Sequence, residues 1–345
     1  MDVQMFWRDQ WYAAAWGSEI VDKPVARMVC NEAIVLFRRT NGEVAALADY
    51  CPHRLLPLSE GHQEGDLLVC RYHGVRIDHE GICRYAPRTK KVGPKFRANT
   101  YTVVERYELI WVWIGNPDNV DESGVPAFPW LSDSRWTGRG GMFEINCDFR
   151  LLVDNLMDLT HEAAVHSNSI GQPELLDAPF DTEVNGDDVR IKRHMFGVPQ
   201  PAFQSTYIQR ELKTDGPIDR LQDIRFVKPT NVTIDACFAV PGTGADQGDR
   251  SRAITFMVLN IITPSTPTRT MYFWNIVRDF LIEDEEVSEV LQAGINVVFA
   301  EDVEVLEAQQ RAIEHAPEKR MRMLGIDTGA SCVRSVIERG VGATN

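Results

Sequence analysis

The sequence predicts an α+β protein made of two consecutive domains, the first all-β and the second combining an antiparallel sheet with one long helix. Its 345 residues exceed the size at which a single hydrophobic core usually suffices. Short runs of β-branched and aromatic residues, separated by turn signals, occur through residues 10–115. Longer strand patterns follow, and a helical pattern of apolar residues comes after them.

Composition narrows the class of protein. Hydrophobic residues make up 44% of the chain and charged residues 25%, as in ordinary globular proteins. The net charge of −14 argues against nucleic acid or an anionic membrane as the main partner. We find no signal-peptide pattern, and the longest apolar run, residues 109–114, is too short to span a bilayer. Seven cysteines, an odd number, indicate free thiols or metal ligands, so we expect a cytoplasmic protein.

The first domain is expected to span residues 10–115. The runs at 33–37 and 44–47 flank a Thr40-Asn41-Gly42 turn, and the run at 107–113 closes the domain. Residues 116–136 are rich in Pro, Asp and Ser, which is typical of a linker. We therefore place the two domains at residues 1–120 and 121–345.

Two segments of this domain each combine a cysteine with a histidine. Cys51 and His53 form a Cys-x-His pair, Cys70 and His73 form a Cys-x2-His pair, and sixteen residues lie between His53 and Cys70. Two cysteines and two histidines are the ligands of a Rieske [2Fe–2S] cluster. A structural zinc uses the same ligand types, but usually with Cys-x2-Cys and His-x3–5-His spacing. The other cysteines are expected to be small buried hydrophobes: Cys30, Cys83, Cys147, Cys237 and Cys332.

A second pair of histidines, His161 and His166, lies in a helix-like segment at residues 154–166. Two histidines and a carboxylate form the facial triad of non-haem Fe(II) oxygenases. On a regular helix, side chains five apart diverge by roughly 140°. The pair can therefore share a metal only if the helix loosens or ends near His166. The alternative is an amphipathic helix whose histidines pack in the core or face solvent.

The rest of the second domain contains strand candidates and a helix. We expect the helix at 284–315, ending before Pro317 and closing the chain. Asp302 falls on its apolar face with Ile295, Val298 and Leu306, whereas Glu301 does not. A carboxylate aimed into a core costs several kcal/mol unless it is paired or binds a metal. Asp302 is therefore the candidate third ligand, the alternative being a capped or water-bridged acid. The expected strands are residues 142–147, 189–194, 231–238, 253–263 and 270–277.

In order along the whole chain, these motifs resemble the terminal oxygenase component of Rieske non-haem iron oxygenases. The resemblance implies an N-terminal all-β Rieske [2Fe–2S] domain and a helix-grip catalytic domain. It implies a mononuclear Fe(II), with O2 as co-substrate. The implied cluster ligands are Cys51, His53, Cys70 and His73, and the implied iron ligands are His161, His166 and Asp302. Neither cluster loop has the second cysteine of respiratory Rieske proteins.

Two polar residues that precede His161, Asp158 and Asn155, are candidates for supporting the iron site. Asp158 lies one turn before His161, so its carboxylate can accept an N–H from that ring. The resemblance implies that Asp158 joins the iron site to His73 of a neighbouring subunit in a ring, usually a homotrimer. Asn155 is a candidate for lining this route or approaching the iron. The chain has no Gly-x-Gly-x-x-Gly or ferredoxin motif, so NAD(P)H must act through a separate reductase, with or without a ferredoxin.

Within the family, the run at 147–162 is most similar to the vanillate O-demethylase and dicamba monooxygenase branch. The branch implies an aromatic acid substrate, and we expect O-demethylation of vanillate or a similar methoxybenzoate to the phenol plus formaldehyde. Alternatives are a ring-hydroxylating dioxygenase, a methyl-hydroxylase on another aromatic carboxylate or sulfonate, and a non-enzymatic Rieske electron carrier. Candidates for holding the substrate's carboxylate, each more often a surface or strand-edge residue, are His194, Arg210, Arg252 and Asn260.

Overall fold

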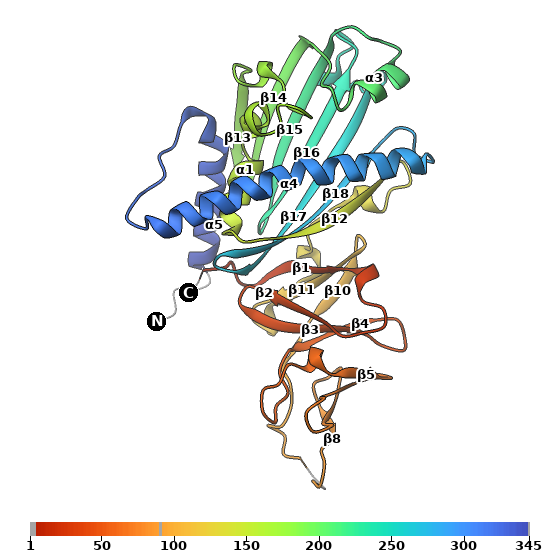
Figure 1. Ribbon diagram of the computed structural model, residues 1–345, viewed down its shortest axis with the longest axis vertical. Coiled ribbons are helices and arrows are strands. Elements are labelled where there is room, and N and C mark those ends of the chain that lie inside the picture. Colours follow the sequence, from red (N-terminus) through yellow and green to blue (C-terminus); the bar gives the residue numbers. More distant parts are fainter. Residues whose placement is uncertain (1–4, 90–91, 344–345) are drawn as a thin grey trace. The chain divides into compact units, whose positions relative to one another are not determined.

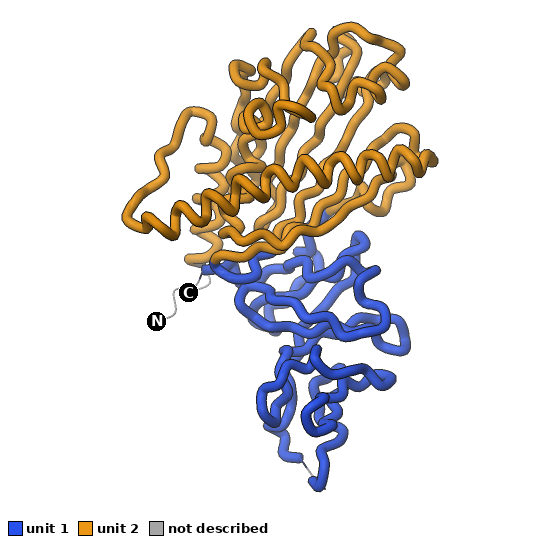
Figure 2. The backbone as a smooth tube through the Cα atoms, in the orientation of Figure 1, with its two compact units in different colours: residues 1–127, 263–267, 343–345 blue, residues 128–262, 268–342 orange. Residues whose placement is uncertain are grey.

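The computed structural model describes residues 5–89 and 92–343, and it confirms the predicted α+β class. The chain forms two compact units (Figures 1 and 2). Unit 1 comprises residues 1–127, 263–267 and 343–345, and unit 2 comprises residues 128–262 and 268–342. Unit 1 therefore includes a short segment from far along the sequence.

The described residues of unit 1 form three small antiparallel sheets. Its strands are short and rich in Val, Ile, Ala and Trp, residues that fit a pleated, half-buried surface. One sheet has the order β1 (Gln10–Trp16), β11 (Leu109–Ile114), β10 (Val103–Arg106). The second has the order β2 (Val25–Val29), β3 (Glu32–Arg38), β4 (Val44–Ala48), β9 (Thr100–Tyr101). The third contains β5 (His62–Glu64), β6 (Leu67–Val69), β7 (Arg76–Asp78) and β8 (Cys83–Tyr85).

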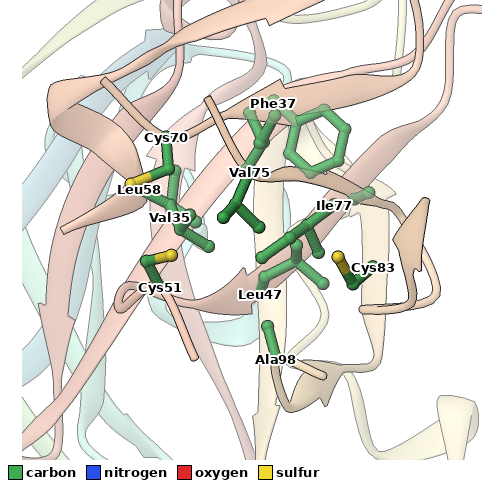
Figure 3. Packing of buried hydrophobic residues seen from close by; sticks show 12 residues of the cluster. Val35, Phe37, Leu47, Cys51, Leu58, Cys70, Val75, Ile77, Cys83 and Ala98 are labelled. Atoms are coloured by element: carbon green, nitrogen blue, oxygen red, sulfur yellow. The ribbon is translucent and has the colours of Figure 1, made fainter. Parts of the chain in front are cut away.

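The two cysteine–histidine loops follow strands of unit 1. One comes after β4 and the other after β6. Cys51 and Cys70 are buried in a core with Val35, Leu58 and Ile77, to which both loops contribute (Figure 3). The shared core brings the two loops together.

Unit 2 is built on a seven-stranded sheet in which the pairings described are antiparallel. Helix α4 (Glu285–His315) crosses this sheet (Figure 1), and its buried stripe includes Leu291, Ile295 and Asp302. Asp284 caps α4, because its side chain accepts from the Val287 N–H. The strands run in the order β12 (Thr137–Ile145), β18 (Arg269–Arg278), β17 (Ala253–Thr266), β16 (Asn231–Ala239), β15 (Ile218–Val227), β14 (Asp188–Val198) and β13 (Phe180–Asn185).

The structure differs from the sequence prediction in the histidine segment. Residues 154–166 do not form one helix: α1 (Phe149–Leu156) ends, a 3₁₀ turn η6 spans Leu159–His161, and α2 spans Glu162–Val165. Asp158 caps the new turn by accepting from the Thr160 N–H. The break and the end of α2 at Val165 are the loosening that a shared metal requires.

Other elements also escaped prediction. α4 does not close the chain, because α5 (Thr328–Ala343) follows it. Strands β13 and β15 and the short helix α3 (Ser205–Leu212) were not expected. In β15, Asp219, Arg220, Gln222 and Asp223 interrupt the apolar pattern, so this strand resembles a surface loop.

Candidate active site

Two histidines and one aspartate from distant parts of the chain lie together in unit 2. His161 ends η6, His166 follows α2, and Asp302 lies in the middle of α4. The Nε2 atoms of His161 and His166 lie 3.4 and 3.2 Å from Oδ1 of Asp302. The three ligand atoms all lie within 4.8 Å of one another. This donor set suits iron(II), so the residues fit the metal expected from the sequence.

The other nitrogen of each histidine has an acceptor of its own. Nδ1 of His161 lies 2.6 Å from the backbone oxygen of Asp158, and Nδ1 of His166 lies 2.7 Å from Oε2 of Glu301. Each Nδ1 therefore donates, which leaves Nε2 with a free lone pair toward Asp302. Burial lowers the pKa of His166, but the hydrogen bond and charge of Asp302, the hydrogen bond to Glu301 and the charge of Glu162 outweigh it, so the pKa lies above its ordinary value.

The structure corrects the contact expected for Asp158. Its backbone oxygen accepts from His161, while its carboxylate accepts from the Thr160 N–H at 2.9 Å. The carboxylate accepts from this N–H because Asp158 is the N-cap of η6. Arg193 of β14 lies 3.6 Å from the same carboxylate and donates to the Thr160 hydroxyl.

Asn155 reaches the same centre from α1. Its Nδ2 donates to Oδ1 of Asp302 at 3.1 Å, the oxygen nearest to both histidines. Its Oδ1 is buried and has no hydrogen-bond partner. Asn155 therefore touches the candidate ligand Asp302 directly.

A cavity between the sheet and α4 ends at these ligands. About 640 Å³ of space not occupied by atoms lies in it, and part of that space is open solvent. His161, His166 and Asp302 line one part of it. The polar residues Glu162, Gln204, Arg220 and Gln222 also line it. Its apolar walls include Ile234, Ala236, Phe238, Phe256, Val258, Ile276, Ile295, Val298 and Phe299.

A buried ion pair forms the polar wall of this cavity. Nη2 of Arg220 donates to Oε2 of Glu162 at 2.7 Å, and both side chains are almost fully buried. Nη1 of Arg220 donates to Oε1 of Gln172 and to the Ile170 carbonyl. Nε2 of Gln222 donates to Oε1 of Glu162 at 3.0 Å. Each Glu162 oxygen thus accepts one hydrogen bond from a side chain of β15.

Sequence reasoning missed this wall and proposed other residues for the substrate's acid group. His194 instead lies 2.7 Å from Asp223, Arg210 pairs with Asp284, and Asn260 accepts from Tyr272. None of them, and not Arg252, belongs to the described lining of the cavity. The signal that could have found Arg220 is the alternation of β15, which places residues 220 and 222 on the same face.

The two cysteine–histidine loops of unit 1 share the same backbone hydrogen bond and a residue with positive φ. The Cys51 carbonyl accepts from the Leu55 N–H and the Cys70 carbonyl accepts from the Gly74 N–H, both at 2.9 Å. Leu55 and Gly74 both have positive φ, 61° and 68°. The rings of His53 and His73 lie 4.6 Å apart between centroids.

The Cys51 thiol lies in surroundings that suit a metal-bound thiolate. Burial raises the pKa of Cys51 to about 11, while hydrogen bonds from the backbone N–H groups of His53 and Arg54 act in the opposite direction. Such N–H donors toward sulfur are a feature of iron–sulfur sites, so the residues fit the cluster. Both sulfurs are buried and both histidine rings are exposed.

The remaining cysteines agree largely with expectation. Cys30, Cys83, Cys147 and Cys237 are buried, as predicted, whereas Cys332 is only half-buried. All are free thiols. Among the residues described, no helix combines the length and the apolar character needed to cross a membrane.

Comparison with known sequences points the same way as the geometry. Residues 10–107 match the Rieske [2Fe–2S] domain, and residues 145–343 match the vanillate O-demethylase oxygenase C-terminal domain. The chain is 40% identical to the vanillate O-demethylase oxygenase subunit of Pseudomonas sp. (strain HR199 / DSM 7063) over 337 residues. This match covers 97% of the chain and 95% of the relative.

Solved structures show the same architecture. Dicamba monooxygenase bound to 3,6-dichlorosalicylic acid has a TM-score of 0.91 and 30% identity, covering 98% of both chains. The crystal structure of dicamba monooxygenase with non-haem iron and dicamba has a TM-score of 0.84 and 31% identity, again covering 98% of both chains.

Proposed function

Because this chain belongs to the vanillate O-demethylase oxygenase family of Rieske proteins, we propose that it is the terminal oxygenase of a multicomponent aromatic O-demethylase. The observation that carries the proposal is the His161–His166–Asp302 cluster at the end of a largely apolar cavity. We assign residues 1–120 to the Rieske domain and 121–345 to the catalytic domain. The substrate we expect is vanillate or a similar methoxybenzoate.

Each cofactor has a donor set in the chain. Cys51, Cys70, His53 and His73 would hold the [2Fe–2S] cluster, and His161, His166 and Asp302 would hold Fe(II). When bound, the cluster supplies single electrons and the mononuclear iron supplies O2 activation. Asp158 and Glu301 orient the two iron-binding rings, and Asn155 holds the Asp302 carboxylate.

The overall reaction fixes what the partners must deliver. A methoxyarene, O2, two electrons and two protons give a hydroxymethyl ether and water. The ether then releases formaldehyde and leaves the phenol. The apolar cavity walls hold the aromatic ring and exclude water. An NAD(P)H-dependent reductase, with or without a ferredoxin, supplies the electrons.

Electron transfer between subunits of a homotrimer completes the proposal. In the two cysteine–histidine loops, the side chains of Leu55 and Tyr72 are 70% and 55% exposed and lie close in sequence to His53 and His73. In unit 2, a groove lined by Asp158 and His161 also contains the half-exposed Met321 and Met323. These two surfaces support a contact between subunits in which Asp158 links the metal sites. The free thiols support a cytoplasmic location.

The test is product analysis with a purified reductase, NAD(P)H and a panel of methoxybenzoates. Formaldehyde and the corresponding phenol in equal amounts are expected, with about three irons and two sulfides per chain. A cis-diol would instead identify a ring-hydroxylating dioxygenase. Two irons with two sulfides, no product and no recovery on adding Fe(II) would identify an electron carrier.

A further inference from the structure

The polar wall of the cavity contains an amide whose orientation is fixed. The Glu162 carboxylate can only accept hydrogen bonds, so Gln222 must turn its NH2 group toward it, at 3.0 Å. The carbonyl end of that amide therefore points away from Glu162. Gln222 is 2% exposed, it lines the cavity, and its Oε1 is buried without a partner.

The position of Gln222 in β15 also indicates that its side chain faces the cavity. Arg220 and Gln222 alternate with Leu221, which packs on the opposite face of the sheet with Cys237 and Ala239. Across the strand pair, Gln222 lies opposite Ala236, another residue of the cavity wall. The small Ala236 side chain leaves room beside the amide for a polar group of the ligand.

The same wall is a poor site for a carboxylate. Among the described residues that line the cavity, Arg220 is the one Arg or Lys. Its charge is already balanced by Glu162, its Nη1 donates to Gln172 and Ile170, and its guanidinium lies over the Phe238 ring. An anionic group here would compete with Glu162 for the same cation. A neutral hydrogen-bond donor suits the wall better, because it satisfies the oxygen of Gln222.

We propose that Gln222, oriented by Glu162, accepts a hydrogen bond from a phenolic hydroxyl of the substrate, so that the site selects methoxyphenols over methoxyarenes without that hydroxyl. Glu162 directly follows His161 in the chain and accepts from the Gln222 amide. Gln222 and His161 therefore line the same cavity. The inference rests on the proposed O-demethylation and names the chemical feature by which its substrate is recognised.

The experiment measures binding rather than turnover. Isothermal titration of the anaerobic, metal-loaded protein without reductant gives the Kd of 4-hydroxy-3-methoxybenzoate, 3-methoxybenzoate and 3,4-dimethoxybenzoate. We expect both ligands without the hydroxyl to bind at least about tenfold more weakly, because each leaves a buried acceptor unpaired. In Gln222→Met the three values should agree within about twofold.

Gln172→Met is the matched control. Gln172 is also a buried glutamine that contacts Arg220, but it does not belong to the described lining of the cavity. This variant should keep the tenfold preference, which separates loss of the acceptor from disturbance of the ion pair. Equal binding of the three ligands by the wild-type protein would overturn the inference, as would a preference that survives in Gln222→Met.

The outcomes separate this inference from the proposed function. Formaldehyde release from both phenolic and non-phenolic ligands, with equal Kd values, keeps the O-demethylase and overturns the role of Gln222. A tenfold preference that is lost in Gln222→Met, without any formaldehyde, keeps the role of Gln222 and overturns the reaction. If Gln222→Met does not fold, Gln222→Leu takes its place, and a preference that survives in that variant likewise overturns the inference.

Discussion

Glu301 accepts a hydrogen bond from Nδ1 of His166 at 2.7 Å, although its side chain lies partly in solvent. This contact fixes the ring so that Nε2 faces Asp302. Carboxylate–histidine–metal arrangements of this kind raise the basicity of the ligand and hold its tautomer. The helical pattern of α4 places Glu301 off the buried face, so the sequence predicts a metal-binding role for Asp302 and none for Glu301.

Replacing Glu301 by alanine should weaken Fe(II) binding by about 10- to 100-fold, the usual effect of removing such a partner. Glu301→Gln should restore part of the affinity, because its amide oxygen can still accept from Nδ1. Titration of the metal-free protein with Fe(II) measures the change. Glu304→Ala, at an exposed position of the same helix, serves as the control and should leave the affinity unchanged.

Asp302→Ala should abolish turnover and the mononuclear iron while the spectrum of the [2Fe–2S] cluster stays intact. The carboxylate lies beside both Nε2 atoms, so its loss leaves two ligands for the iron. Iron and sulfide analysis together with absorption spectra would check this. Full activity, or loss of the cluster, would rule out the assignment of Asp302.

Asp158→Asn should retain both metal sites and slow electron transfer between subunits. Asparagine is also a good N-cap, so η6 and the backbone contact to His161 should persist. The charge beside Arg193 disappears. Single-turnover rates after reduction of the cluster measure the effect, and rates equal to the wild type would count against the bridging role.

Glu162→Gln should lower the free energy of unfolding by about 3–5 kcal/mol, because Arg220 would remain buried without its counter-charge. Urea denaturation monitored by fluorescence gives this value. Glu183→Gln removes one partner of an exposed pair with Lys192 and should cost less than about 1 kcal/mol. Similar values for the two variants would contradict the importance of burial here.

Two buried cysteines should resist thiol reagents in the native protein. Burial raises the pKa of Cys147 and of Cys237 to about 12 in each case. At pH 8 both thiols are therefore protonated, and the thiolate is the reactive form. Half-buried Cys332 should react with iodoacetamide first. Peptide mass spectrometry would show this order, and native labelling of Cys147 would disprove it.

Local sequence patterns were sufficient for much of this structure. The runs at 33–37, 44–47 and 107–113 form strands as predicted, and the buried face of α4, including Asp302, follows from periodicity. The break at Asp158 was less visible, because an aspartate inside a helix-like run is also compatible with a solvated helix position. Which atom of Asp158 contacts His161 depends on this break and could not be read from spacing.

The burial of Arg220 and Gln222 could not be predicted from local sequence patterns. Polar residues on a strand usually face solvent, and the polar residues of β15 resemble those of a surface segment. Their burial becomes intelligible only with Glu162, which lies about sixty positions earlier in the chain. A pairing over that distance is set by the fold as a whole.

The segment at 263–267 gives unit 1 a discontinuous sequence. In unit 1, the Cys30 and Asn31 N–H groups donate to the carbonyls of Pro264 and Ser265, and the Thr263 hydroxyl donates to the Ala13 carbonyl. A fragment that ends at residue 127 would lack Thr263, Pro264 and Ser265, and with them all three of these hydrogen bonds. An exchange of the N-terminal domain between related oxygenases therefore has to include the segment at 263–267. Recombination at the linker alone would produce mismatched chimeras.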